Sequence, residues 1–255
     1  MPESLAACTL VIVPTYNEAE NVATLVAAIL QALSTVNILF VDDNSPDGTQ
    51  EKIALMQYQH RNKVYLLPRA GKLGLGTAYV AGFQWALTRD YQVIVQMDAD
   101  LSHDPADLPR LLKQLEDHDA VVGSRYVDGG GTRHWSIVRQ GISKAGALYA
   151  RWLLGLPIQD PTGGYNVWHR RVLEAIDFKA VQSEGYAFQI ELKYRAYHAG
   201  FHLVEAPIVF TERRVGSSKM SMRIVLEAMR RTWQLRGLCP GQSILSQRPI
   251  ERQYP

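Results

Sequence analysis

The stretch Val93-Ile94-Val95-Gln96-Met97-Asp98-Ala99-Asp100 runs from apolar residues into two carboxylates separated by a single residue. Its first part has the composition of a buried strand, so the carboxylates emerge where the strand ends. Two anions this close repel each other unless a cation lies between them, and Mg²⁺ prefers one or two carboxylates together with phosphate oxygens. Because open α/β sheets bind ligands at the carboxyl ends of their strands, the stretch predicts a metal–diphosphate site. The alternative is a polar turn that caps the next helix.

Strands and helices alternate on both sides of this stretch. We predict strands at 10–13, 36–41, 63–67, 92–97 and 120–123, and helices at 17–33, 49–58, 76–88 and 105–115. Pro14 is expected to end the first strand, and Asn17 with Glu20 is expected to form a capping box for the first helix. Such alternation is typical of βαβ units, so we predict an α/β fold whose mostly parallel, Rossmann-like sheet has helices on both faces.

The second half of the sequence does not continue this regular alternation of strands and helices. We predict helices at 136–154, 171–176 and 188–199, a strand at 203–209, and a last helix that begins near Lys219. The helix at 136–154 carries an apolar stripe at helical spacing, formed by Val138, Ile142, Ala145, Tyr149 and Trp152. With their basic flanks, this helix and the last one are typical of amphipathic segments that lie in a membrane interface. Packing of the stripe against the core is the alternative.

Composition narrows the class of protein. The chain has 255 residues, 47% of them hydrophobic, which is enough for one large domain or two small ones. A net charge of +2 predicts no nucleic-acid partner, although most Arg and Lys residues follow position 124 and hint at an anionic partner there. Cys8 and Cys239 predict neither a disulfide framework nor a zinc site. We find no signal-peptide pattern and no membrane-spanning apolar stretch, so we expect a soluble or peripheral protein.

Six short motifs together resemble a known family. They are Pro14-Thr15-Tyr16-Asn17-Glu18, the segment from Asp42 to Thr49, the segment from Asp98 to Pro105, Gly123-Ser124-Arg125-Tyr126, the segment from Ser183 to Gln189, and the segment from Arg213 to Ser221. The first three are similar to motifs of family 2 glycosyltransferases of the GT-A fold. The last three narrow the resemblance to dolichyl-phosphate (polyprenyl-phosphate) mannosyltransferases. The resemblance covers about residues 10–221.

The resemblance implies a nucleotide pocket and a metal site. The implied nucleotide-binding residues are Pro14, Tyr16, Glu18, Val41, Asp42, Asp43, Asp98, Ala99 and Asp100. Asp98 and Asp100 are also the implied ligands of Mg²⁺ or Mn²⁺, a Lewis acid that neutralises the leaving diphosphate. Ser102 is a candidate for a further oxygen ligand, and His103 is expected to be an ordinary loop residue. From the residues alone, Pro14 as a strand stop and Asp42 as the start of an Asx turn stay open.

Cations are needed where an acceptor phosphate approaches a donor diphosphate. Arg binds phosphate oxygens in pairs, and Lys adds a point charge. The resemblance assigns this role to Arg125, Arg139, Arg213 and Lys219, with Ser143 as a hydroxyl donor. With Asp98 and Asp100, these four cations form the expected catalytic set. The alternative for each cation is a solvated surface position.

The region Gly185–Gln189 lacks a Glu-Asp pair that related hydroxyl-directed enzymes commonly carry. A hydroxyl acceptor needs a general base, whereas a phosphate monoester is largely dianionic at neutral pH because its second pKa is about 6. The lack of the pair favours a phosphate acceptor. Glu184 and Glu191 lie close by, so the alternative stays open.

The resemblance implies inverting transfer of mannose from GDP-mannose to dolichyl or polyprenyl phosphate, by a peripheral enzyme on the cytoplasmic face of a membrane. A small membrane-anchoring subunit is a candidate partner. We expect one GT-A domain at 1–237, with a nucleotide-binding half at 8–124, an acceptor-binding half at 125–237 and a polar tail at 238–255. The alternatives are UDP-glucose or another donor, a soluble hydroxyl acceptor, and a non-catalytic membrane-surface protein that binds nucleotide sugars.

Overall fold

The computed structural model describes residues 7–181, 183–212 and 222–237, and of 222–227 it describes the backbone only. The strands in these ranges are β1 (Thr9–Thr15), β2 (Asn37–Asp42), β3 (Val64–Pro68), β4 (Val93–Gln96), β5 (Ala120–Ser124), β6 (Gly131–Arg133), β7 (Asn166–His169), β8 (Leu203–Pro207) and β9 (Val209–Thr211). The α-helices are α2 (Val22–Ala32), α3 (Thr49–Gln59), α4 (Leu75–Leu87), α5 (Leu108–Leu115), α6 (Ile137–Leu154), α7 (Arg170–Glu174), α8 (Gly185–His198) and α9 (Met222–Leu235). Short 3₁₀ turns lie at Pro105–Asp107 and Phe178–Ala180.

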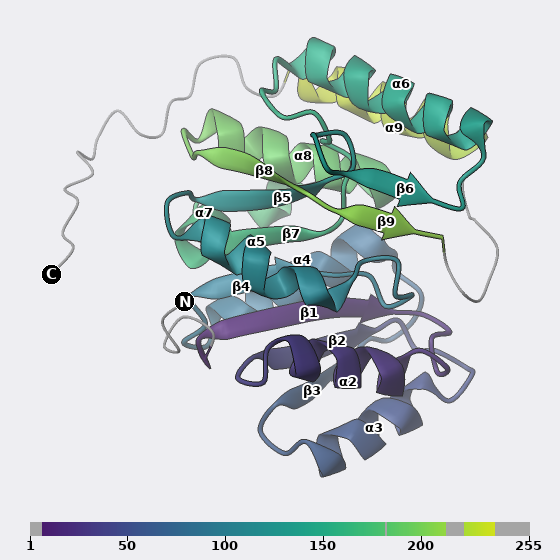
Figure 1. Ribbon diagram of the computed structural model, residues 1–255, viewed down its shortest axis with the longest axis vertical. Helices are drawn as coiled ribbons and strands as arrows, with labels where there is room; N and C mark the ends of the chain where they lie inside the picture. Colours follow the sequence, from purple (N-terminus) through teal and green to yellow (C-terminus); the bar gives the residue numbers. More distant parts are fainter. Residues whose placement is uncertain (1–6, 182, 213–221, 238–255) are drawn as a thin grey trace, which may run out of the picture.

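Seven strands form one sheet in the order β3-β2-β1-β4-β7-β5-β8, as Figure 1 shows. Every pairing in it is parallel except those of β7, which runs antiparallel between β4 and β5. The sheet therefore crosses the boundary that we drew between the two halves at residue 124. Because the parallel strands share one direction, their carboxyl ends lie at one edge of the sheet, where a ligand site is expected.

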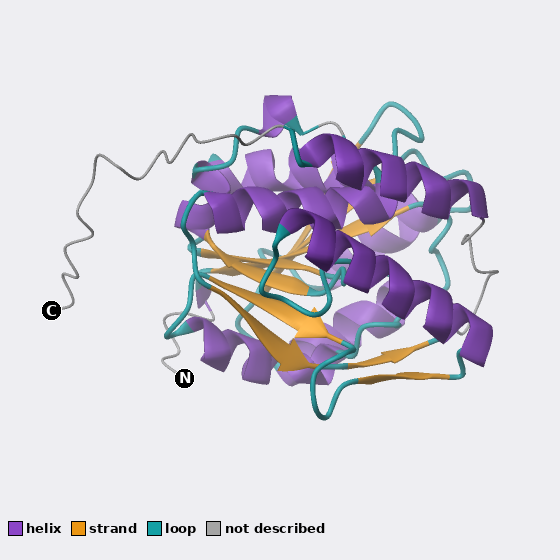
Figure 2. Cartoon of the chain, turned by 90° about the horizontal axis from the view of Figure 1, so that it is seen from above, coloured by secondary structure: helices purple, strands orange, loops and turns teal. Residues whose placement is uncertain are grey.

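Helices cover both faces of this sheet, as predicted. Residues of α2, α3 and α5 share one buried apolar cluster with alternate residues of β1, β2 and β4. The other face of the same strands packs against α4, α7 and α8. A third cluster joins α6, α8 and α9, and both views show α6 and α9 side by side at the outer end of the molecule (Figures 1 and 2). β1, β2, β4 and β5 are buried on both faces, which explains their continuous apolar sequence.

The prediction that Pro14 ends the first strand was wrong. β1 continues to Thr15, and Pro14 pairs in register with Val41 of β2. The pairing of β1 with β4 stops earlier, at Ile12. Pro14 therefore lies where β1 has a neighbour on one side only, a position at which the missing N–H is tolerated.

The predicted capping box at Asn17 was also wrong. The helix begins at Val22, and Asn17 has a left-handed backbone with φ of 61°. Residues 17–19 form a loop instead, because their backbone N–H groups donate to Ser45 Oγ, Thr49 Oγ1 and Asp47 Oδ2. Hydrogen bonds to a distant segment thus replace the local cap.

Two further differences lie in the second half. The single predicted strand at 203–209 is two strands, because β8 ends at Pro207 and β9 pairs with β6 in a separate two-stranded sheet. α8 begins at Gly185, three residues before the predicted start. The predicted start of the last helix near Lys219 lies outside the described residues.

Close packing of α4 against β1 depends on Gly82. A Cβ atom at this position would lie 2.6 Å from Cγ2 of Ile12. We expect Gly82→Ala to lower the free energy of unfolding by about 1–3 kcal/mol through overpacking. Gly141→Ala on α6 is the control, since nothing lies within 4 Å of its Cβ position, and better helix propensity should raise the free energy by up to about 1 kcal/mol. Urea unfolding measures both, and an unchanged value for Gly82→Ala would contradict the close contact.

Candidate active site

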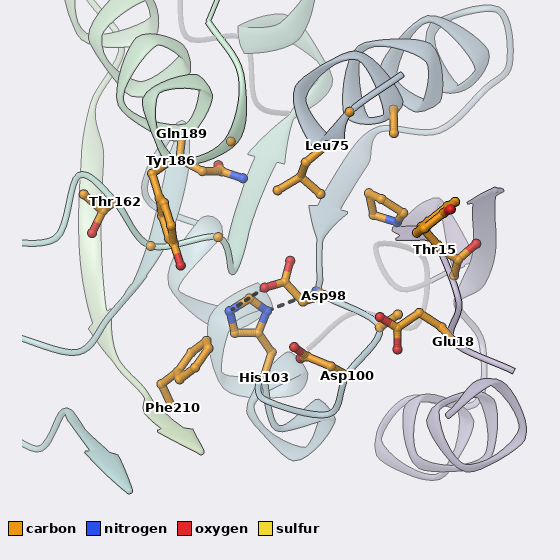
Figure 3. Close-up of a pocket in the computed structure, with 18 of the residues that line it drawn as sticks. Thr15, Glu18, Leu75, Asp98, Asp100, His103, Thr162, Tyr186, Gln189 and Phe210 are labelled. Atoms are coloured by element: carbon orange, nitrogen blue, oxygen red, sulfur yellow. Dashed lines mark hydrogen bonds and ion pairs between the residues drawn. The ribbon is translucent and has the colours of Figure 1, made fainter. Parts of the chain in front are cut away.

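The carboxyl ends of β1, β4 and β5 border a cavity of about 350 Å³. Figure 3 shows its lining, with Thr15 and Glu18 at one end, Asp98 in the middle, and Thr162 and Tyr186 at the other end. Lining residues also come from the loop before α4, from the first turns of α8 and from β9. Elements far apart in the sequence therefore meet at the predicted edge of the sheet.

The aspartate pair lies at the exit of β4, inside this cavity. The backbone N–H of Asp98 donates to Nδ1 of His103 at 3.1 Å, and the side chain of Asp98 is 28% exposed. Leu101 has a φ of 60°, an unusual value for a leucine. The turn it makes brings the N–H of Ser102 back to Oδ1 of Asp100 at 3.1 Å. The backbone is thus bent so that both carboxylates remain at the strand end.

His103 is more than the ordinary loop residue that we expected. Its ring is buried, stacks on Tyr165 at 5.0 Å between centroids, and meets the edge of Phe210 at 5.4 Å. Burial lowers the pKa of His103, although the charges of Asp98 and Asp100 oppose this shift. A neutral ring with Nδ1 as acceptor must carry its proton on Nε2, which lies 3.9 Å from Oδ2 of Asp98.

The residues around this pair fit a divalent metal ion. Ser102 Oγ is buried and has no hydrogen-bond partner, which leaves an oxygen available as a ligand. Among the described residues no three His, Cys, Asp or Glu side chains are grouped as metal ligands. The cavity therefore offers the two carboxylates of Asp98 and Asp100, and Ser102, close to them in sequence, is not one of its lining residues. The carboxylate pair is suited to Mg²⁺ or Mn²⁺, which complete their shells with phosphate oxygens and water.

One end of the cavity contains most of the predicted nucleotide residues. Pro14, Tyr16, Glu18 and Asp43 all line it. Asp43 accepts from the guanidinium of Arg69 and, at 3.0 Å each, from the N–H groups of Leu73 and Gly74. Asp43 thereby connects the Gly-rich loop at residues 71–74, which precedes α4, to the exit of β2.

That loop brings Lys72 to Tyr16. The ammonium of Lys72 lies 4.1 Å from the centre of the Tyr16 ring, within the range of a cation–π contact. An aromatic ring and a cation thus lie together at this end of the cavity, which is what a base and its phosphates require.

Asp42 and Val41 are placed differently from the other predicted nucleotide residues. Neither is among the residues that line the cavity, and both are fully buried. The carboxylate of Asp42 accepts from Thr15, Ser45 and Gln50. The geometry of Asp42 is that of an Asx turn that positions the loop after β2.

The other end of the cavity carries two of the predicted arginines. Arg125 is buried, and its Nε and Nη2 atoms each donate to Asp160 at 2.7 Å. Arg139 donates to Glu212 at 2.7 Å and lies 3.9 Å over the ring of Trp135, while its Nε is buried without a partner. Both arginines line the cavity. Arg213 and Lys219 lie outside the described residues.

Ser143 borders a second, smaller cleft next to the first. This cleft has a volume of about 60 Å³, lies between α6, α8 and α9, and shares Arg125, Trp135, Thr162 and Tyr186 with the main cavity. The hydroxyl of Tyr126 donates to Ser143 Oγ at 2.6 Å. Apolar groups of Ile142, Ile190 and Met229 line the rest of it.

Neither of the nearby glutamates faces the main cavity. Glu191 is buried on the side of α8 that is turned away from the cavity, where it accepts from Arg195 and from the N–H of Ser183. Glu184 is exposed and is not a lining residue. The carboxylates that line the described cavity are those of Glu18, Asp43, Asp98 and Asp100, and the position on α8 that faces it carries the amide of Gln189.

Sequence reasoning missed several lining residues. Lys72, Thr162, Tyr186, Gln189 and Phe210 were given no role, although all border the cavity. Gln189 and Tyr186 belong to a motif that we quoted for the resemblance, and Lys72 belongs to the Gly-rich loop, so a signal was present for these three. Phe210 reaches the site through the pairing of β9 with β6, which no local pattern indicated.

The family model for glycosyl transferase family 2 matches residues 10–177. The chain belongs to this family. A polyprenol monophosphomannose synthase of Mycolicibacterium smegmatis is 49% identical to it over 232 residues, which cover 90% of this chain and 88% of that protein. An undecaprenyl-phosphate mannosyltransferase of Micrococcus luteus is 46% identical over 220 residues, which cover 86% of this chain and 90% of that protein.

Solved structures confirm the predicted GT-A fold. Glucosyl-3-phosphoglycerate synthase of Mycobacterium tuberculosis, in complex with Mn²⁺, UDP-glucose and phosphoglyceric acid, matches with a TM-score of 0.62 at 18% identity. The match covers 93% of this chain and 84% of that chain. The same protein in complex with UDP matches with a TM-score of 0.64 at 17% identity. Family and fold together make this chain a glycosyltransferase.

A buried lysine beneath the cavity makes the free energy of unfolding depend on pH. Lys193 of α8 donates to the carbonyl oxygen of Gly163 at 2.7 Å, and burial lowers its pKa to about 7. Asp160 and Glu205 oppose this shift, whereas Arg125 adds to it. Between pH 7 and the ordinary lysine pKa, the unfolded chain binds a proton that the folded chain lacks. Folding stability contributed by this group therefore rises with pH in that range.

We expect the free energy of unfolding of the wild type minus that of Lys193→Met to rise between pH 7 and 10. The slope should be on the order of 1 kcal/mol for each pH unit, because one proton is involved. Below pH 6 the difference should be constant, which serves as the internal control. Urea unfolding at fixed ionic strength measures it, and a difference independent of pH across the whole range would contradict a neutralised buried lysine.

Proposed function

We propose that this enzyme transfers mannose from GDP-mannose to a polyprenyl or dolichyl phosphate with inversion at the anomeric carbon. The observation that carries the proposal is the order of groups along the cavity. Figure 3 shows Asp98 and Asp100 between an end with Glu18 and an end with Thr162. Arg125 donates to Thr162 at 2.7 Å, and both Arg125 and Arg139 line the same cavity. The names of the two curated relatives support mannose as the sugar and a polyprenyl phosphate as the acceptor.

In this mechanism the acceptor phosphate is the nucleophile. One of its oxygens forms a bond to the anomeric carbon while the bond from that carbon to the diphosphate breaks, and a single in-line displacement inverts the configuration. The phosphate is already largely dianionic at neutral pH. This agrees with an amide at position 189 rather than a carboxylate.

Asp98 and Asp100 would hold Mg²⁺ or Mn²⁺, and Ser102 is a candidate for a further oxygen ligand. The bound ion supplies Lewis-acid stabilisation of the leaving diphosphate. Arg125 and Arg139 screen the acceptor phosphate from the donor, and the pairing of Arg125 with Asp160 fixes the direction of its guanidinium. Tyr16, Glu18 and Lys72 bind the nucleotide. Asp42 acts through the loop that it positions. Arg213 and Lys219 lie outside the described residues, and the resemblance gives them a role in binding the acceptor phosphate.

We expect labelled GDP-mannose to yield an organic-soluble product with polyprenyl phosphate and Mg²⁺ or Mn²⁺. UDP-glucose, other nucleotide sugars and soluble hydroxyl acceptors should yield none. Asp98→Asn should lower turnover by about 100-fold or more, because the leaving diphosphate loses electrostatic stabilisation. The control is Asp90→Asn, an exposed aspartate before the same strand, which should retain activity. Full turnover after chelation of divalent ions would refute the metal assignment.

We also propose that the enzyme binds the cytoplasmic face of a membrane peripherally through α6. No helix among the described residues is long and apolar enough to cross a membrane. Of the predicted stripe, Val138, Ala145 and Trp152 are exposed, whereas the core side of α6 is formed by Ser143, Ala147, Ala150, Leu153 and Leu154. Ile142 and Tyr149 of the stripe are half-buried, so packing of the stripe against the core is wrong for its three exposed residues.

The exposed face of α6 combines apolar and basic side chains. Ile137, Val138, Leu148 and Trp152 are between 64% and 87% exposed, and helical spacing places Lys144 and Arg151 on the same face. This combination suits an anionic lipid surface. The small cleft between α6, α8 and α9 is lined by the inner side of α6, reaches Arg125 and is a suitable place for the first part of the prenyl chain. A small membrane-anchoring subunit would cover part of the same face.

Replacing Leu148 and Trp152 together by Ser should weaken binding to vesicles of phosphatidylcholine and phosphatidylglycerol by about 10-fold or more, given the apolar area lost. Turnover with a short, water-soluble polyprenyl phosphate should not change. The matched control replaces Leu55 and Tyr58, exposed on α3 at the opposite end of the molecule (Figure 1). Vesicle co-sedimentation measures binding, and an equal effect of both double variants would contradict the assignment.

A further inference from the structure

Three buried amides form a row from the sheet to the cavity. Gln96 of β4 and Asn166 of β7 are register partners in the antiparallel pair, and Gln189 of α8 lies next to Asn166. Gln96 and Asn166 have no exposed surface, and Gln189 is 3% exposed. Buried amides are costly unless their hydrogen bonds are made. Their partners therefore show which end of each amide is the oxygen and which is the nitrogen.

The partners of this row fix the orientation of each amide. The indole N–H of Trp168 only donates, so the atom of Gln96 at 2.8 Å from it is Oε1. Asn166 presents its amide nitrogen to this oxygen at 3.1 Å and to the carbonyl oxygen of Gly163 at 3.2 Å. The same nitrogen lies 3.1 Å from Oε1 of Gln189, and its two hydrogens are shared among these three acceptors. Turning the Gln189 amide around would oppose two donors.

Nε2 of Gln189 is therefore the cavity end of the row. It is buried without a hydrogen-bond partner, as are Nε2 of Gln96 and Oδ1 of Asn166, but of these three residues only Gln189 lines the main cavity. Figure 3 shows its amide nitrogen directed into that cavity, toward the space between Tyr186 and Leu75 and on the same side as Asp98. A fixed donor without a partner, aimed into a binding cavity, indicates a ligand oxygen.

The position of this donor decides which ligand group it meets. The aspartate pair takes the diphosphate, and the arginines lie at the acceptor end. The sugar in transfer lies between them, and Gln189 is near this middle region. A neutral amide donor suits a neutral hydroxyl, whereas Arg and Lys suit phosphate oxygens.

We propose that Gln189 Nε2 donates a hydrogen bond to a hydroxyl oxygen of the transferred sugar and thereby determines donor specificity. This inference rests on the proposed function, because it takes a nucleotide sugar as the ligand. A sugar without that hydroxyl leaves the buried donor unpaired. Sites of this kind reject such analogues more strongly than apolar pockets do.

The test compares the wild type with two variants that change the donor. Gln189→Glu keeps an oxygen to accept from Asn166 and has the same shape, whereas Gln189→Leu removes all polar atoms. Gln84→Leu, on the exposed side of α4, is the control. Thermal unfolding and GDP binding of each variant report on the fold and on the nucleotide end.

Turnover is measured with GDP-mannose and with its four monodeoxy analogues, which lack the hydroxyl at C2, C3, C4 or C6. We expect both Gln189 variants to lower kcat/KM for GDP-mannose by about 10- to 100-fold, with GDP affinity unchanged. One deoxy analogue should be a poor donor for the wild type, because it lacks the hydroxyl that Gln189 binds. The same analogue should be equally poor for the variants, because they have already lost this hydrogen bond and lose nothing further. The Gln84 variant should behave as the wild type.

If the wild type and both variants discriminate among all deoxy analogues to the same extent, the inference is wrong while mannose transfer stands. A loss of GDP affinity that accounts for the whole effect overturns it as well. If the wild type transfers another sugar and not mannose, the proposed function fails. The same comparison with deoxy analogues of that sugar then decides the role of Gln189.

Discussion

The buried ion pair between Arg125 and Asp160 is the interaction on which the site depends. Asp160 has no exposed surface and accepts from the backbone N–H, Nε and Nη2 of Arg125. Burial raises the pKa of this carboxyl, but the charge and hydrogen bonds of Arg125 outweigh burial and lower it. Removing one partner of such a pair costs about 3–5 kcal/mol, because the other charge is left uncompensated. The exit of β5 is thereby fixed to the turn at 160–164.

The turn at 160–164 connects this ion pair to other residues around the cavity. A Cβ on Gly163 would lie 2.9 Å from the carbonyl oxygen of Gly123, and one on Gly164 would lie 3.4 Å from the His103 ring and 3.7 Å from the Asp98 carboxylate. At Gly163 the backbone passes this close only because the residue has no side chain, whereas a Cβ at Gly164 would make ordinary van der Waals contacts. The carbonyl oxygen of Gly163 then orients Asn166 and accepts from Lys193. One ion pair thus determines the floor beneath the aspartates and the amide row that ends at Gln189.

The sequence predicts what depends on short-range patterns. The alternation of strands and helices and the carboxylates after β4 are local features, and they placed most elements within a few residues. The capping box at Asn17 failed because Ser45 and Thr49, far along the chain, accept from the N–H groups of Asn17 and Glu18. A capping box needs the N–H of Asn17 for the side chain of Glu20. The antiparallel direction of β7 and the pairing of β6 with β9 depend on tertiary packing and have no periodic signal. The same holds for the environment of His103, which aromatic residues of β9 and the 160–165 segment create.

The geometry of α8 answers a question that the sequence left open. Glu191 is two residues after Gln189, and two residues on a helix are about 200° apart. When Gln189 faces the cavity, Glu191 must face away from it, and there Arg195 and the N–H of Ser183 occupy its oxygens. A glutamate close in sequence is therefore unable to act as a base on an acceptor in the cavity. The residues of α8 that line the described cavity include no carboxylate, and this favours an acceptor that arrives already ionised.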